Sequence, residues 1–348
     1  MTTANNSAHA QAANQPAGGA SWDAIPRDNL KPFLEKHTLT ALRILAVNWM
    51  LIAFSFAIVI VQPTWYTIIV AMIILGGRQL GLGILTHECA HRSFVASRPV
   101  GEWLGNWLCG APVMVDLEIY RQYHMTHHVK TGTADDPDLV NYRHYPVSTS
   151  SLLRKFARDL VGITGLRSLV ALAFLYGQKP SEKSIAGYSY KPVSSTDSTT
   201  APAMRIAPLR LFWNLRRSVI ANAGLFAVFV CLNHPLVYLL WPASWMTTYM
   251  VFTRIRNAAE HGALAGTSSN DVWGNTRTVE ANWFERLTVA PNYVNYHFEH
   301  HLAPTVPSYN LPKLHQWMIE QGAFQRAPLE LGYGQILRRL VGQTKPGV

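Results

Sequence analysis

Histidines at regular spacing are the residues of this 348-residue chain best suited to carry out chemistry. Nine of its fourteen histidines fall within four short segments. Histidines that share a segment are mostly separated by three or four residues, an offset that places side chains on one face of a helix. The nine candidate ligands are His87, His91, His124, His127, His128, His261, His297, His300 and His301.

A shared metal centre is the chemistry that this spacing favours. Nine imidazoles exceed the about four ligands that tetrahedral zinc accepts, whereas two ions with about five or six ligands each would use them all. Imidazole binds zinc, copper, nickel and iron alike, so we infer iron from the number of ligands and the chemistry. The isolated histidines are expected to be ordinary surface or hydrogen-bonded residues: His9, His37, His144, His234 and His315.

Two long charge-free stretches predict that the chain crosses a membrane. Hydrophobic residues make up 49% of the chain and charged residues only 14%. Roughly 35 residues without Asp, Glu, Lys or Arg separate Arg43 from Arg78, and again Arg217 from Arg254. Because about 20 apolar residues span a bilayer, each stretch fits two short helices. A turn near the middle of each, at Pro63 and at Pro235, indicates helical hairpins.

The predicted fold is all-α and integral to the membrane, with four transmembrane helices in two hairpins and a cytoplasmic helical cap that holds a histidine-ligated dimetal site. The spans are expected at about residues 41–61, 66–86, 211–232 and 236–256. A disordered tail at 1–25 would precede a membrane domain at 26–326, and a C-terminal tail would follow at 327–348. The stretch 178–203, rich in Ser, Thr and Pro, is expected to be a flexible loop. If the histidine segments form one site, the chain between them must cross the membrane an even number of times. The second charge-free stretch already supplies two crossings, so residues 152–177 are expected to lie in the interface.

The basic balance of the chain indicates its orientation rather than a nucleic-acid partner. The formal net charge is +10, but basic residues flank the apolar stretches and both hairpin turns lack them. We therefore expect the histidine segments and both termini to lie in the cytoplasm, with no nucleic-acid binding. The cysteines are far apart and form no CxxC pair, so neither a disulfide framework nor a thiolate metal site is predicted.

The histidine segments resemble those of the membrane fatty acid desaturase and hydroxylase family, whose HxxxH, HxxHH and HxxHH boxes lie around two membrane hairpins. The string His-Glu-Cys-Ala-His that begins at His87, followed by Arg92-Ser-Phe, is similar to box one of acyl desaturases. The string Asn295-Tyr-His-Phe-Glu-His-His-Leu-Ala-Pro, followed by Asn310-Leu-Pro-Lys-Leu-His, is similar to box three and the segment after it. The resemblance covers residues 41–316.

This resemblance implies an O2-dependent diiron desaturase of the acyl-lipid type, which introduces a double bond into an alkyl chain. Its cofactors would be two iron ions, cycling between Fe2+ and Fe3+, with O2 as co-substrate. The nine histidines would be both the catalytic and the metal-binding residues. His261 matches an additional metal-binding histidine of the family, and Asn257 matches an asparagine that reaches an ion through water.

Carboxylates in and near the boxes are interpreted as partners that orient the imidazoles. A residue next to a helical ligand points about 100° away from it, which argues against direct ligation. Solvated or structural roles are the alternative. The carboxylates are Asp135, Asp136, Asp138, Glu88, Glu260 and Glu299.

The expected partners are a lipid or fatty acyl substrate, the bilayer and a separate electron donor such as a ferredoxin or cytochrome b5. No haem motif or cysteine set in the sequence would supply electrons. The expected location is a bacterial inner membrane. A hydroxylase acting on a lipid, carotenoid or sphingoid base is an alternative with the same ligands. A histidine-rich metal transporter is disfavoured because transport ligands lie within the spans, and an inactive lipid-binding relative because no box histidine is missing.

Overall fold

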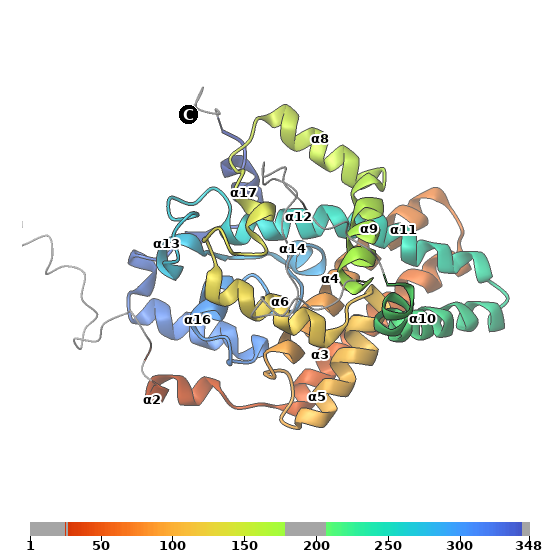
Figure 1. The fold of residues 1–348 in the computed structure, drawn as a ribbon, viewed down its shortest axis with the longest axis horizontal. Helices are drawn as coiled ribbons and strands as arrows, with labels where there is room; N and C mark the ends of the chain where they lie inside the picture. The colour runs from red at the N-terminus through yellow and green to blue at the C-terminus, as the bar shows by residue number, and fades with distance from the viewer. Residues whose placement is uncertain (1–24, 26, 178–206, 343–348) are drawn as a thin grey trace, which may run out of the picture.

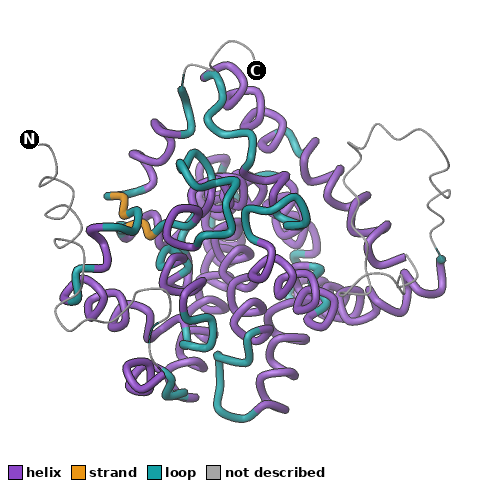
Figure 2. Tube along the Cα trace, turned by 60° about the vertical axis from the view of Figure 1, so that its left-hand side comes forward, coloured by secondary structure: helices purple, strands orange, loops and turns teal. Residues whose placement is uncertain are grey.

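The computed structural model describes residues 25, 27–177 and 207–342. These residues are mostly helical, as predicted, and the two strands that they contain form one short parallel pair (Figure 2). Strand β1 (Thr278–Val279) pairs with β2 (Leu329–Glu330), with Thr278 opposite Leu329. The predicted loop at 178–203, and the predicted N-terminal tail apart from Ile25, lie outside the described residues.

The first apolar stretch forms the expected hairpin of two long helices, α3 (Thr38–Val61) and α4 (Trp65–Ala90). At the turn, the Thr64 hydroxyl accepts a hydrogen bond from the Thr67 amide, and the Thr64 amide donates to the Thr67 hydroxyl, which caps α4. Helices of this length reach about 36–39 Å, more than the about 30 Å of a bilayer core. Both helices are long and apolar enough to cross a membrane.

The second apolar stretch differs from the two uninterrupted spans expected there. Helix α10 (Pro208–Cys231) is continuous, but its first ten residues contain three arginines, which lowers its apolar character. The chain then forms a 3-10 turn, η5 (Pro235–Leu239), followed by α11 (Leu240–Met246) and α12 (Thr248–His261), with the break at Thr247. Within the described residues, four spans are therefore not confirmed; α3 and α4 alone qualify as single unbroken helices.

Helices α8 (Thr149–Leu160) and α9 (Ile163–Gly177) form a bent pair at the position of the stretch expected in the interface. Their axes differ by 70°, a geometry typical of either a broken span or a re-entrant segment. Asp159 at the end of α8 is buried and accepts two hydrogen bonds from Arg254 of α12, at 2.5 and 2.8 Å. This ion pair anchors the bend to the helix that ends at His261.

Short helices make up the rest of the described chain, and several of them lie beside α4 and α12 (Figure 1). Loops connect these helices and hold the candidate histidines close to the residues that contact them. In chain order the short helices are α2 (Arg27–Leu30), η2 (Lys31–Phe33), α5 (Arg98–Leu104), η3 (Gly105–Gly110), η4 (Ala111–Val113), α6 (Leu117–Lys130), α7 (Leu139–Tyr142), α13 (Val272–Asn275), α14 (Trp283–Leu287), η6 (Pro291–Tyr293), α15 (His297–Leu302), η7 (Ser308–Asn310), α16 (Leu311–Glu320), η8 (Ala323–Gln325) and α17 (Tyr333–Arg339).

The segment predicted as a C-terminal tail, 327–348, is folded as far as residue 342. Tyr333, Ile336 and Leu340 are buried in an apolar cluster with residues of α4 and α12. The backbone of Val147 also exchanges hydrogen bonds with the segment, accepting from the Gly342 amide and donating to the Leu340 carbonyl. Two buried residues in a helix of seven, followed by Leu340, give a weak sequence signal for a packed helix, which explains the difference. Residues 343–348 lie outside the described residues.

Two adjacent glycines let α4 pack closely against its neighbours. A Cβ at Gly76 would lie 2.3 Å from the Thr248 hydroxyl oxygen, and one at Gly77 would lie 2.2 Å from the Leu287 carbonyl oxygen. Backbone atoms cannot move aside as a flexible side chain can, so the contact at Gly77 is the stricter of the two. Small residues at these positions therefore allow α4 to occupy the centre of the fold.

Gly77→Ala is expected to destabilise the protein, because the added methyl group collides with the Leu287 backbone. Overpacking of this kind costs about 1–3 kcal/mol. Gly83→Ala is the matched control in the same helix, because a Cβ at Gly83 would meet no atom within 4 Å, and it should not lower stability. The thermal midpoint of the detergent-solubilised protein measures both. Equal midpoints for the two variants would contradict the close approach.

Candidate metal centre

The nine candidate histidines come from four elements whose ends meet. His87 lies in the last turn of α4 and His91 directly follows that helix. Helix α6 supplies three histidines, α12 ends on His261, and α15 supplies three more. Offsets of three and four residues turn each set toward one side of its helix, as the sequence predicts. The structure brings all nine histidines into two neighbouring groups.

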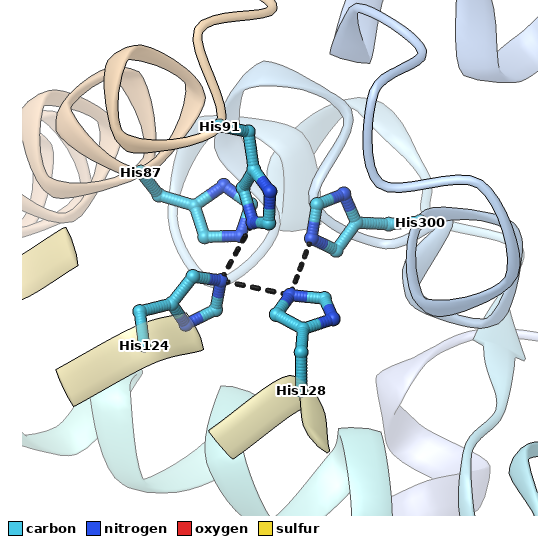
Figure 3. A group of neighbouring side chains, drawn as sticks. All are labelled: His87, His91, His124, His128 and His300. Carbon is cyan, nitrogen blue, oxygen red and sulfur yellow. Dashed lines mark hydrogen bonds between the residues drawn. The ribbon is translucent and has the colours of Figure 1, made fainter. Parts of the chain in front are cut away.

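The first group contains one nitrogen from each of five imidazoles, all within 4.8 Å of one another (Figure 3). The Nε2 atom of His124 lies 2.9 Å from Nε2 of His91 and 2.9 Å from Nε2 of His128. His300 closes the group, with its Nε2 atom 3.1 Å from that of His128. The five members are His87, His91, His124, His128 and His300.

The second group joins four imidazoles with the same limit of 4.8 Å between candidate ligand atoms. Within it, Nε2 of His261 lies 3.0 Å from Nε2 of His297. The rings of His128 and His301, one from each group, stack with centroids 4.3 Å apart, so the groups are adjacent. The four members are His127, His261, His297 and His301.

The nitrogen spacing fits ligands that share an ion. A metal–imidazole bond is about 2.1 Å long, so two ligands at right angles have nitrogens about 3.0 Å apart. The contacts of 2.9 to 3.1 Å match this separation. In addition, buried Nε2 atoms of His87 and His301 have no hydrogen-bond partner among the described residues. A metal ion in each group would satisfy these atoms.

Burial keeps several of these imidazoles neutral, which is the form that binds metal. Burial, followed by the positive charge of Arg121, lowers the pKa of His91 to about 3. Burial and neighbouring histidines lower the pKa of His128 to about 2, and the pKa values of His300 and His301 also fall well below the usual range. No proton therefore competes with a metal ion for these nitrogens near neutral pH.

Hydrogen bonds at Nδ1 orient two ligands of the second group. The Nδ1 atom of His127 lies 2.8 Å from a carboxylate oxygen of Asp136, and Nδ1 of His261 lies 2.9 Å from the Asn275 carbonyl oxygen. Such acceptors hold the proton on Nδ1 and leave Nε2 free for a metal. Tyr142 extends the arrangement, because its hydroxyl donates to Asp136 and its ring lies 5.0 Å from that of His261.

The carboxylates named from the sequence take different positions. Glu88 lies 3.3 Å from Nδ1 of His87, and Glu260 lies 3.4 Å from Nδ1 of His297. Asp138 accepts a hydrogen bond from the Tyr123 hydroxyl at 2.8 Å and is 3.8 Å from His127. Two others are placed differently: Asp135 is exposed, and Glu299 binds His315 and Thr278.

The contacts of Asn257 do not test its predicted role as a metal partner. It lies on α12, half-buried, and its side-chain oxygen accepts a hydrogen bond from Arg256 at 3.3 Å. Its water-mediated role stays a prediction. Sequence reasoning did not identify Tyr142 or Asn275, which end the four-residue helices α7 and α13; helices this short give no periodic signal. For Tyr142, the only sequence signal is its short distance along the chain from Asp136.

Comparison with known proteins agrees with the arrangement of the site. A family model described as fatty acid desaturase matches residues 63–331. Dihydrorhizobitoxine desaturase of Bradyrhizobium elkanii is 25% identical, over 77% of this chain and 72% of that protein. Chloroplastic omega-6 fatty acid desaturase of Spinacia oleracea is 23% identical, over 75% of this chain and 55% of that protein, so the chain spans little more than half of that relative.

A third relative matches a shorter region. The sn-1 acyl-lipid omega-3 desaturase (ferredoxin) of Synechocystis sp. is 29% identical over 126 residues, which is 36% of this chain and 33% of that protein. The family match is much broader, because it covers well over half of the chain and includes all nine histidines of the two groups. The chain belongs to the fatty acid desaturase family.

Proposed function

We propose that this chain is an O2-dependent membrane desaturase that uses two histidine-bound iron ions to introduce a double bond into an alkyl chain. The observation that carries the proposal is the convergence of nine buried or half-buried histidines into two adjacent groups of five and four. Family membership supports the oxidoreductase class. Imidazole-rich sites also suit zinc and copper, so the choice of iron rests on the oxidative chemistry of the family.

The proposed reaction balances with an external source of electrons. One O2, two electrons and two protons, together with two hydrogen atoms removed from adjacent carbons, give one double bond and two molecules of water. When bound, the two irons would supply the redox chemistry that side chains lack. Within the described residues, no cysteine set is available to bind an iron–sulfur cluster, which supports a separate donor such as a ferredoxin or cytochrome b5.

The residues of the chain would orient the ligands and exclude water. Asp136 and the Asn275 carbonyl fix ring orientation in the second group, which keeps both Nε2 atoms directed inward. A narrow space about 10 Å³ in volume is lined by Glu88 and three of the candidate histidines, together with apolar side chains that include Ile84 and Leu311. It has room for about one water-sized molecule. Such surroundings would keep bulk water from a reactive carbon.

The substrate class that we propose is a fatty acyl chain, in agreement with two of the relatives named above. The B. elkanii relative is named for dihydrorhizobitoxine, so assays should also include a substrate of that kind. Hydroxylation of a lipid, carotenoid or sphingoid base is the alternative outcome, because the same ligands serve both reactions and the position of the substrate decides between them. A metal transporter is a remote alternative.

We propose a multi-pass location in a bacterial inner membrane, with the histidine segments and both termini in the cytoplasm. The two membrane-capable helices, α3 and α4, support membrane association. Exposed apolar side chains on α3, such as Met50 at 60% and Phe54 at 53% exposure, are suited to contact lipid. Asn257 as a water-mediated metal partner belongs to the same proposal.

The lipid profile of an expression host tests the reaction. Cells that express the intact chain should contain a lipid lighter by two hydrogens, which cells expressing His127→Ala with His300→Ala should lack, because each group loses a ligand. Mass spectrometry with double-bond localisation makes the measurement, and membrane fractionation checks that both proteins insert. A gain of one oxygen would identify a hydroxylase. Turnover retained in the double variant would refute the metal-centre account.

Asp136→Asn is expected to weaken metal binding, because the Nδ1 hydrogen bond of His127 loses its charged acceptor. Loss of such a partner typically lowers metal affinity by about 10–100-fold. Asp135→Asn, one residue away and exposed, is the matched control and should bind metal as the wild type does. Iron retained after dialysis against graded chelator concentrations measures the difference. Equal retention in both variants would show that Asp136 does not support the site.

A further inference from the structure

A basic hollow lies on the protein surface beside the second histidine group. Its volume is about 500 Å³, within the range of ligand and partner pockets. Its walls come from three segments far apart in the sequence: Arg143 and Tyr145, then Ala263 and Thr267, and finally Arg339 of α17. None of the nine residues that line it is acidic. The hollow is therefore suited to a negatively charged occupant.

One wall of this basic hollow is attached directly to His261, and a second continues to a residue beside it. Ala263 follows His261 by two residues, so their Cα atoms are at most about 7.6 Å apart. The Thr267 hydroxyl donates a hydrogen bond to the His261 carbonyl oxygen at 2.9 Å. In another segment that lines the hollow, Arg143 directly follows Tyr142, whose ring lies 5.0 Å from the His261 ring. A single layer of residues thus separates the hollow from the second group.

The cationic side chains around the hollow outnumber the one carboxylate, that of Glu330, that forms an ion pair with them. Arg143 and Arg339 are both exposed, and Arg339 forms an ion pair with Glu330 at 2.7 Å. Lys155 adds a third cation, with its Nζ atom 5.7 Å from the centre of the Tyr145 ring. Cations that share one concave surface raise the local concentration of acidic partners and accelerate their association.

The wall formed by the loop after α12 is held in a constrained shape. Ala263 has a φ of 53°, in the left-handed region that non-glycine residues rarely adopt. The preceding carbonyl, that of Gly262, accepts a hydrogen bond from the buried guanidinium of Arg277. The Nε and Nη1 atoms of this guanidinium have no hydrogen-bond partner among the described residues. The guanidinium of Arg277 therefore lies behind this wall, where the buried carboxylate of Glu330 offsets part of its charge.

We propose that this basic hollow is the docking site of an acidic electron-carrier protein that reduces the metal centre. The proposal rests on the proposed function, which requires two electrons from outside the chain. Each carrier molecule would be oxidised by one electron, so two would dock in succession for each double bond formed. Docking here would bring the carrier within one residue layer of His261 without opening the site to water.

Binding of an acidic [2Fe–2S] ferredoxin to the full-length, detergent-solubilised protein tests the proposal. Arg143→Glu should raise the dissociation constant at least about tenfold at low ionic strength, and the difference should shrink at high salt because screening weakens charge attraction. Lys313→Glu makes the same charge change at an exposed position on α16, which does not line the hollow, and should bind as the wild type does. The rate of reduction by ferredoxin should follow the same order.

Equal binding by wild type and Arg143→Glu, or equal loss in Lys313→Glu, would overturn the proposal. The proposal would also be overturned if Arg143→Glu kept its ferredoxin binding but bound more weakly to vesicles of anionic lipid. That result would identify the hollow as a site for lipid headgroups. Single turnover with dithionite as reductant separates this question from the reaction itself. Arg143→Glu should then form as much product as the wild type, whereas absence of product in the wild type would refute the proposed function and leave the docking result intact.

Discussion

The close packing of nine imidazoles in the protein interior is the constraint on which the rest of this structure depends. Ring nitrogens of different chain segments face one another at about 3 Å, and a buried polar atom without a partner costs about 1–3 kcal/mol. Metal ions would convert these costs into ligand bonds. The arrangement is stable only if every segment that carries a histidine is fixed in position, and the surrounding contacts accomplish this.

Helix ends, rather than helix centres, provide several of the ligands. His87 and His261 lie in the last turns of α4 and α12, so the apolar stretches deliver their ligands to the region where the short helices gather (Figure 1). The glycine contacts of α4 and the Asp159–Arg254 ion pair fix these two helices relative to their neighbours. The electron-carrier site proposed above is separated from His261 by one layer of residues, which would allow reduction without exposing the centre.

Local periodicity made much of this arrangement predictable. Offsets of three and four residues predicted that the histidines would converge, and charge-free stretches predicted the hairpin of α3 and α4. Other features depend on contacts between distant segments. The break at Thr247, the binding of Glu299 to His315 and the support of His261 by the Asn275 carbonyl leave no local pattern. Buried residues of α17 are too few to distinguish a packed helix from a tail.

Iron content, measured in variants of each histidine group, is the decisive measurement for a centre that holds two ions. We expect two iron ions per chain in the purified wild type, and one in each of two double variants, His91→Ala with His300→Ala and His261→Ala with His297→Ala. X-ray absorption at the iron edge should report the same nitrogen-rich environment for the ion that remains. A single ion in the wild type, or a predominance of zinc, would contradict the account.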